Sequence, residues 1–169
     1  MKLYYKKFGS FIFLLYICTR KNINMQVFII GSPLETAKAL DRRRLNKQII
    51  ECQQILNAIE GKTRSWSNHP CTIQYREYRS WLIHYFNTLI HYRRYIVLQD
   101  GFYLDAAKIC DCCANKLIPL FHTSEYFENM KKRLYTKDNE YYKQWENLGE
   151  SYENWYWVDN KWKIYKQTK

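Results

Sequence analysis

The sequence predicts an all-α fold, a compact single-domain bundle of helices with an aromatic-rich C-terminal tail. Hydrophobic residues recur at helical spacing over most of the chain, and residues typical of helix caps stand at the ends of these runs. The chain has 169 residues, of which 47% are hydrophobic, so it can bury one core but has little length for a second. We therefore expect one helical domain.

The first helices are predicted from a clear start signal. Ser32 is a typical N-cap, Pro33 suits the first helical position, and Glu35 completes a capping box. Asp41 weakens the pattern and can cap a second helix, which Gly61 ends. Before this start, residues 25–30 form a short apolar segment for which an extended conformation is one option. Helically spaced apolar residues are Leu34, Ala37, Leu40, Leu45, Ile49, Cys52, Ile55, Leu56 and Ile59.

The second half is also predicted to be helical. After a loop over 62–70, a long helix is expected at about 71–98, and another at 103–117. Two short helices near 124–135 and 138–147 lead to an aromatic tail. The stripe expected to be buried on the long helix contains Tyr75, Tyr78, Leu82, Phe86, Leu89 and Arg93, and the opposite side carries His84, Asn87 and His91.

The first 24 residues differ from the rest. They hold five basic residues and no acid, and their longest apolar run, Phe11–Cys18, is far shorter than the roughly 20 residues of a membrane-spanning helix. Lysines before an apolar run resemble a signal peptide, but no small-residue cleavage site follows. Because Met25 stands where the globular pattern begins, we interpret 1–24 as a translation start assigned too early. A signal-like extension or anchor and a genuine extension are the alternatives, and 25–169 is the predicted domain.

The positive charge is concentrated in part of the chain. The formal net charge is +11, residues 38–94 carry +7, and residues 95–169 are neutral. A localised basic surplus is typical of a surface that binds a polyanion, with nucleic acid favoured over an anionic membrane.

The cysteines favour a reducing compartment. Six cysteines are scattered apart from the Cys110–Cys113 group, which has no second pair to complete a zinc site. No glycine-rich phosphate loop or familiar hydrolase motif is present. We therefore expect free thiols, no metal, no cofactor and an intracellular protein, and the pattern disfavours secretion.

A first candidate binding group lies at 41–51. On a helix, Arg43, Lys47 and Glu51 recur every fourth residue, and Arg44 with Gln48 lies on the neighbouring row. With Arg42, this face presents cations to phosphates and one carboxylate beside them. The alternative is a solvated helix face whose charges are balanced by the acids in the segment.

A second candidate group follows at 62–79. Basic side chains there alternate with Trp66, an arrangement that can contact phosphates and stack on an unpaired base. A capping role for Asn68 or His69 and a core position for Trp66 are the alternatives. The candidate DNA contacts in this group are Arg64, Asn68, His69, Arg76 and Arg79.

Several blocks of the chain occur in a specific order and spacing, namely Met25–Phe28, Leu40–Gln48 with Glu51, Leu56–Ala58, Trp66–Pro70 and Tyr75–Tyr78, followed more loosely by Lys137–Tyr142. In this they resemble the pyrimidine-dimer DNA glycosylases of the phage endonuclease V type and its microbial relatives. The resemblance covers about residues 25–157 and implies an all-α enzyme that repairs ultraviolet-damaged DNA. It begins at Met25, which agrees with the interpretation of residues 1–24.

The resemblance also implies a mechanism. In that family a free N-terminal α-amine attacks C1′ of the damaged nucleotide, and β-elimination from the resulting Schiff base nicks the strand. The nucleophile would lie at Met25, or at Gln26 after removal of the methionine. The family's glutamate falls near Asn46 or Lys47, which makes Glu51 the nearest carboxylate on the same face. The microbial relatives carry a His/Ser/His/Arg cluster where this chain has residues 127–131.

The implied partner is double-stranded DNA with a damaged or abasic site, bound by a monomer. A non-catalytic DNA-binding protein of the same fold is the alternative. It would use the cations alone, namely Arg42, Arg43, Arg44, Lys47, Arg76 and Arg79.

Overall fold

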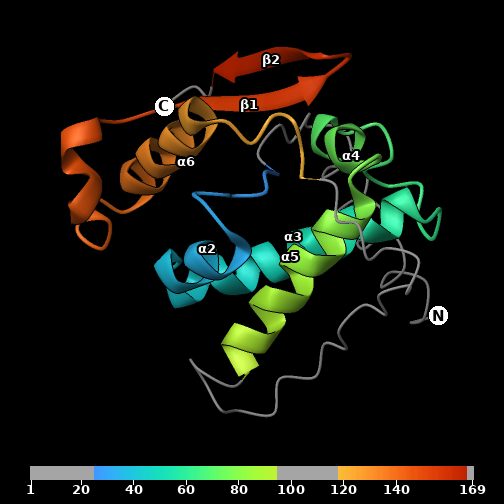
Figure 1. Ribbon diagram of the computed structural model, residues 1–169, viewed down its shortest axis with the longest axis horizontal. Coiled ribbons are helices and arrows are strands. Elements are labelled where there is room, and N and C mark those ends of the chain that lie inside the picture. The colour runs from blue at the N-terminus through green and yellow to red at the C-terminus, as the bar shows by residue number, and fades with distance from the viewer. Residues whose placement is uncertain (1–24, 95–117, 167–169) are drawn as a thin grey trace, which may run out of the picture.

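The computed structural model describes residues 25–94 and 118–166 (Figure 1). The predicted head segment, the predicted helix at 103–117 and the Cys110–Cys113 group lie outside these residues. The described elements are α2 (Pro33–Ala39), α3 (Arg42–Ile59), α4 (Pro70–Tyr75), α5 (Arg79–Tyr92), α6 (Ser124–Lys137), the 3-10 helix η3 (Lys143–Leu148), β1 (Glu153–Val158) and β2 (Lys161–Lys166).

The all-α prediction is wrong, because the aromatic tail forms an antiparallel hairpin of β1 and β2. Asp159 and Asn160 form its two-residue turn with φ of 55° and 56°, which suits the twist of a hairpin. Along β1 the side chains of Asn154, Tyr156 and Val158 are buried and alternate with less buried neighbours. The fold is therefore mostly helical with a small C-terminal sheet, which lies along the top of Figure 1.

The predicted helix starts are confirmed. Ser32 and Glu35 form the reciprocal capping box of α2, with Ser32 N donating to Glu35 Oε2 at 2.7 Å. Asp41 caps α3 and accepts from the backbone N–H groups of Arg43 and Arg44. Helix α3 ends at Ile59, followed closely by Gly61 with φ of 70°.

The single long helix predicted from residue 71 is wrong, because the chain bends between α4 and α5. His69 caps α4 through Nδ1, which accepts from Cys71 N at 3.1 Å. The bend lets α4 pack on β1, where Gln74 Oε1 accepts from Trp157 N at 2.9 Å. The predicted stripe is nevertheless buried throughout, whereas His84, Asn87 and His91 are partly or fully exposed. Residues 95–98 lie outside the described part.

The later short helices are confirmed only in part. Helix α6 covers the predicted 124–135 and continues to Lys137. The predicted helix at 138–147 is instead a turn followed by the 3-10 helix η3.

The apolar segment that begins at Met25 runs through the core without pairing in a sheet. Its first five residues are buried, and four elements hold its backbone through side-chain donors. The carbonyls of Met25, Gln26, Val27 and Phe28 accept from Tyr156, Gln48, Tyr126 and Tyr85 at 2.8, 2.8, 3.3 and 2.7 Å. This segment is thereby fixed between β1, α3, α6 and α5.

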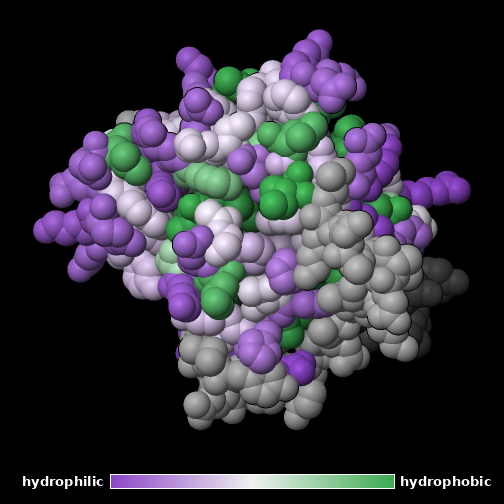
Figure 2. All heavy atoms as spheres, viewed as in Figure 1, coloured by the Kyte–Doolittle hydropathy of each residue, from purple (hydrophilic) through white to green (hydrophobic). Residues whose placement is uncertain are grey.

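The surface is polar around a partly apolar centre. Figure 2 shows hydrophilic residues crowded over the side formed by η3 and α6, and hydrophobic residues in the middle of this face. Among the described residues no helix combines the length and hydropathy needed to cross a bilayer.

Candidate active site and nucleic-acid interface

The candidate carboxylate lies beside the start of the predicted domain. Glu51 is on the buried side of α3, and its Oε2 accepts from Gln48 Nε2 at 2.8 Å. The same Gln48 nitrogen donates to the Gln26 carbonyl at 2.8 Å, and Gln48 Oε1 accepts from Phe28 N at 2.9 Å. One buried amide therefore joins Glu51 to the segment that carries the proposed nucleophile.

The environment of Glu51 favours its protonated form. Only 8% of the residue is exposed, and burial raises the pKa of its carboxyl to about 7 despite the opposing effect of nearby cations. Lys47 is the nearest of these, with Nζ 3.6 Å from Glu51 Oε1. A carboxyl with such a pKa can accept and release a proton near neutral pH.

A cationic pocket of about 250 Å³ is lined by the two residues that contact this carboxyl, Lys47 and Gln48. Both predicted rows of α3 line it, because Arg43 and Lys47 come from one row and Arg44 and Gln48 from the next. Phe28 and Lys137 complete its lining. The four basic side chains give the pocket a positive charge suited to a phosphate or another anion.

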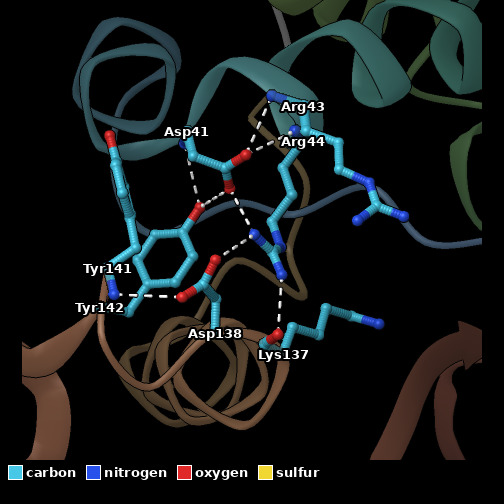
Figure 3. A network of polar contacts seen from close by, with 7 residues as sticks. All are labelled: Asp41, Arg43, Arg44, Lys137, Asp138, Tyr141 and Tyr142. Atoms are coloured by element: carbon cyan, nitrogen blue, oxygen red, sulfur yellow. Dashed lines mark hydrogen bonds and ion pairs between the residues drawn. The ribbon is translucent and has the colours of Figure 1, made fainter.

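Arg44 is engaged inside the protein (Figure 3). It donates to Asp41 Oδ2 at 2.6 Å, to Asp138 Oδ2 at 3.3 Å, and to the carbonyl of Lys137 at 2.9 Å. Tyr142 OH also donates to Asp41 Oδ2 at 2.6 Å. This network ties the start of α3 to the end of α6 and holds the pocket walls together.

Two basic residues of α6 were missed by sequence reasoning. Arg133 is 2% exposed, its Cζ lies 5.4 Å from the centre of the Phe28 ring, and burial lowers the pKa of its guanidinium to about 10. Lys137 Nζ lies 6.0 Å from the same ring. Lys137 and Asp138 belong to a block that carried the family resemblance, but nothing in their spacing indicates contact with α3.

The first predicted DNA-contact group divides by burial. Arg42, Arg43 and Lys47 are exposed, whereas Arg44 is held in the network and Gln48 is 1% exposed. Two of the three exposed cations of α3, Arg43 and Lys47, line the pocket, while the buried Gln48 holds the backbone of residues 26 and 28.

The second predicted group lies around α4. Arg64 and Asn68 are exposed, Arg76 Nη2 donates to Ser67 O at 3.0 Å, and Arg79 pairs with Glu60. His69 caps the helix as described above. Trp66 is partly buried against the core, in the left-handed backbone region with φ of 70°.

The two groups meet the same backbone segment from different elements. The His69 ring lies 5.7 Å from that of Tyr156, whose hydroxyl holds the Met25 carbonyl. The α3 group reaches the segment through Gln48. Residues 25–28 are therefore linked to both sets of predicted DNA contacts, directly through Gln48 and indirectly through Tyr156.

Residues 25–93 match the family model described as pyrimidine dimer DNA glycosylase. This part of the chain is therefore similar to the pyrimidine dimer DNA glycosylases. The match supports a glycosylase-like function in DNA repair, with DNA as the partner. Comparison with curated proteins and with solved structures gives no match.

The segment matched to the glycosylase family contains the proposed nucleophile, Glu51 and every predicted DNA contact. Residues outside it complete the surroundings, because Tyr156 holds the Met25 carbonyl and Lys137 lines the pocket. No group of three or more potential metal ligands occurs within residues 25–94 and 118–166.

Proposed function

We propose that this protein is a DNA glycosylase with associated abasic-site lyase activity, which acts through the N-terminal amine of a chain that begins at Met25 or Gln26. The observation that supports this most strongly is the Gln48 bridge between Glu51 and the Gln26 carbonyl. It keeps a carboxyl beside the segment that would carry the amine, which is the pairing that amine-based glycosylase chemistry needs.

The reaction begins with attack of the neutral amine on C1′ as the bond to the damaged base breaks. The amine loses a proton, the sugar ring opens, and an iminium links the enzyme to C1′. A proton is then removed from C2′ and the C3′–O bond breaks, which nicks the strand and leaves the phosphate as the departing group. Water hydrolyses the iminium and frees the enzyme. An α-amine, with a pKa of about 7.7–8.0, is partly neutral at pH 7.

Glu51 is the proposed proton carrier in these steps. As a carboxylate it stabilises positive charge that develops on the sugar and accepts the C2′ proton. As a carboxylic acid it returns a proton to the departing group. The pKa of about 7 makes both forms available at the same pH.

The exposed basic side chains are proposed to bind the phosphates of damaged duplex DNA. Arg42, Arg43 and Lys47 contact phosphates from α3, and the second group contacts them from the region of α4. Extrusion of the damaged nucleotide is needed to expose C1′, and weak stacking at a lesion lowers its cost. We further propose that the protein works as a monomer in the compartment that contains DNA.

Reductive trapping tests the amine mechanism. Protein begun at Met25 is mixed with abasic-site DNA and cyanoborohydride, and we expect a covalent adduct at the terminal residue. Chemical blocking of the terminus must abolish the adduct at the terminal residue, which peptide mapping by mass spectrometry distinguishes from an adduct on any lysine. If no adduct is found at the terminal residue, or if blocking leaves the amount of trapped protein unchanged because the adduct lies on a lysine alone, the mechanism is contradicted.

A non-catalytic DNA-binding protein is the second candidate. It is favoured by one observation, namely that Met25 N is an amide as long as Asn24 precedes it. This candidate predicts DNA affinity without trapping by any form of the chain. N-terminal sequencing and thiol counting of native protein also test the proposed compartment: a start at Met25, which removes Cys18, together with five free thiols would support it. Cys52 and Cys71 are already free and buried in the structure.

A further inference from the structure

The pocket beside Glu51 contains an amine that needs no chain processing. Lys137, the last residue of α6, lines this pocket together with Lys47 and Gln48. Its carbonyl is fixed by Arg44, and Figure 3 shows its side chain extended away from that network, toward the same side as Arg43. The backbone is thus anchored while the amine faces the pocket.

Two other residues that line the pocket connect Lys137 to the candidate carboxyl. Both Lys47 and Gln48, which share the pocket with Lys137, contact Glu51 directly, at 3.6 and 2.8 Å. The contact of Lys47 with Glu51 is an ion pair. Among the described residues that line the pocket, Lys137 is the lysine for which no ion pair is found, and its Nζ lies over the Phe28 ring.

We propose that Lys137 is a second Schiff-base nucleophile, which gives abasic-site lyase activity to the chain that retains residues 1–24. This inference rests on the proposed function, because it takes the ring-opened abasic sugar as substrate. It differs from that function in the nitrogen that attacks.

The surroundings of Lys137 favour the required neutral amine. Lys137 is exposed as a residue, but partial desolvation of its ammonium at the pocket, together with the cationic Arg133, Lys47 and Arg44, lowers its pKa to about 8, and Glu51 acts in the opposite direction. An unperturbed lysine, with a pKa near 10.4, would be almost fully protonated at pH 7. Such lowered values among cationic neighbours are what make lysines effective nucleophiles toward carbonyl groups.

The reaction of Lys137 with the abasic sugar needs no oxidant or reductant. The Nζ lone pair attacks the C1′ aldehyde carbon, the carbinolamine loses water, and an iminium forms. Glu51 accepts the C2′ proton, the C3′–O bond breaks, and the phosphate leaves. Water then releases the unsaturated aldehyde and restores the amine.

Trapping with the full chain and mapping of the adduct test this inference. Full-length protein, with residues 1–24 verified by intact mass, is incubated with abasic-site DNA and cyanoborohydride and then digested for mass spectrometry. We expect the sugar remnant on the peptide that contains Lys137. Lys137→Arg, which keeps the charge, should lose the adduct, while the exposed Lys143→Arg control should keep it.

Mapping in the unaltered protein makes the result independent of how the variants fold. An adduct on Lys47, on another lysine or only on the α-amine would overturn the role of Lys137. If the full chain gives no adduct while protein begun at Met25 does, the inference fails and the proposed function stands. If neither protein is trapped, both fail.

Discussion

Gln48 and Glu51 lie three residues apart on α3 and share a buried hydrogen bond of 2.8 Å. The amide that makes this bond also holds the backbone of residues 26 and 28. One side chain thus sets the distance between a carboxyl and the segment proposed to begin the functional protein. Because the carboxyl is held by a buried hydrogen bond, we expect a change at either residue to affect stability and the proposed chemistry together.

Glu51→Gln is expected to stabilise the fold at alkaline pH while abolishing lyase activity. The carboxyl pKa is raised from 4.5 to about 7 on folding, so the folded state binds the proton more tightly and stability falls as pH rises between these values. Above pH 7 the variant should be more stable than the parent by on the order of 2–3 kcal/mol, and near pH 4 the gain should vanish. Thermal unfolding at both pH values measures this, and an equal difference at both would contradict it.

Gln48→Ala is expected to destabilise the protein by about 3 kcal/mol. The variant loses three buried hydrogen bonds and leaves the groups of residues 26, 28 and 51 without them, at about 1 kcal/mol each. Urea unfolding measures the loss, with the exposed Gln144→Ala as control. A loss no larger than that of the control would show that the bridge does not hold the segment.

The double variant Arg43→Gln with Lys47→Gln is expected to weaken the dependence of DNA affinity on salt. Each phosphate contact contributes about 0.9 to the slope of log affinity against log salt on duplex DNA, so the slope should flatten by about one to two units. Titrations at several salt concentrations give this slope. The control Lys143→Gln should leave this slope unchanged. An unchanged slope in the double variant would show that Arg43 and Lys47 face solvent without contacting phosphates.

Tyr142→Phe is expected to loosen the junction between α3 and α6. Its hydroxyl donates to Asp41 Oδ2 and accepts from Asp41 N at 3.0 Å, and Asp41 is the cap of α3. Loss of both bonds should cost about 1–2 kcal/mol. Tyr141→Phe is the matched control, because that ring is half exposed. Thermal unfolding of the two variants measures the difference. Equal stabilities would contradict a stabilising role for the network in Figure 3.

The sequence predicts most of the helices and their caps, but few of the contacts between distant elements that complete the candidate site. The caps at Ser32 and Asp41 depend only on residues close to them in the chain, so the sequence predicts them correctly. The bend before α5 depends on packing of Gln74 against β1, which periodicity does not encode. The hairpin could have been found from the Asp159-Asn160 pair between alternating residues, but the aromatic content obscured the period of two.

In the candidate site, too, the sequence predicts positions along one helix but not contacts between different elements. The helical spacing placed Arg43, Lys47 and Glu51 on a common side of α3, as the structure has them. It gave no sign that Gln48 would be buried or that Lys137 would lie opposite, because both depend on contacts between elements far apart in the chain. The catalytic and DNA-binding roles of these residues stay predictions.

Strand incision at a defined lesion is the most direct test of the central claim. Duplex DNA with one pyrimidine dimer is incubated under single-turnover conditions with excess protein begun at Met25, as the parent and as Glu51→Gln. We predict that the parent nicks the damaged strand at the dimer, that Glu51→Gln does not, and that both bind the DNA equally. Binding without any incision by the parent, or equal incision by the variant, would contradict the claim.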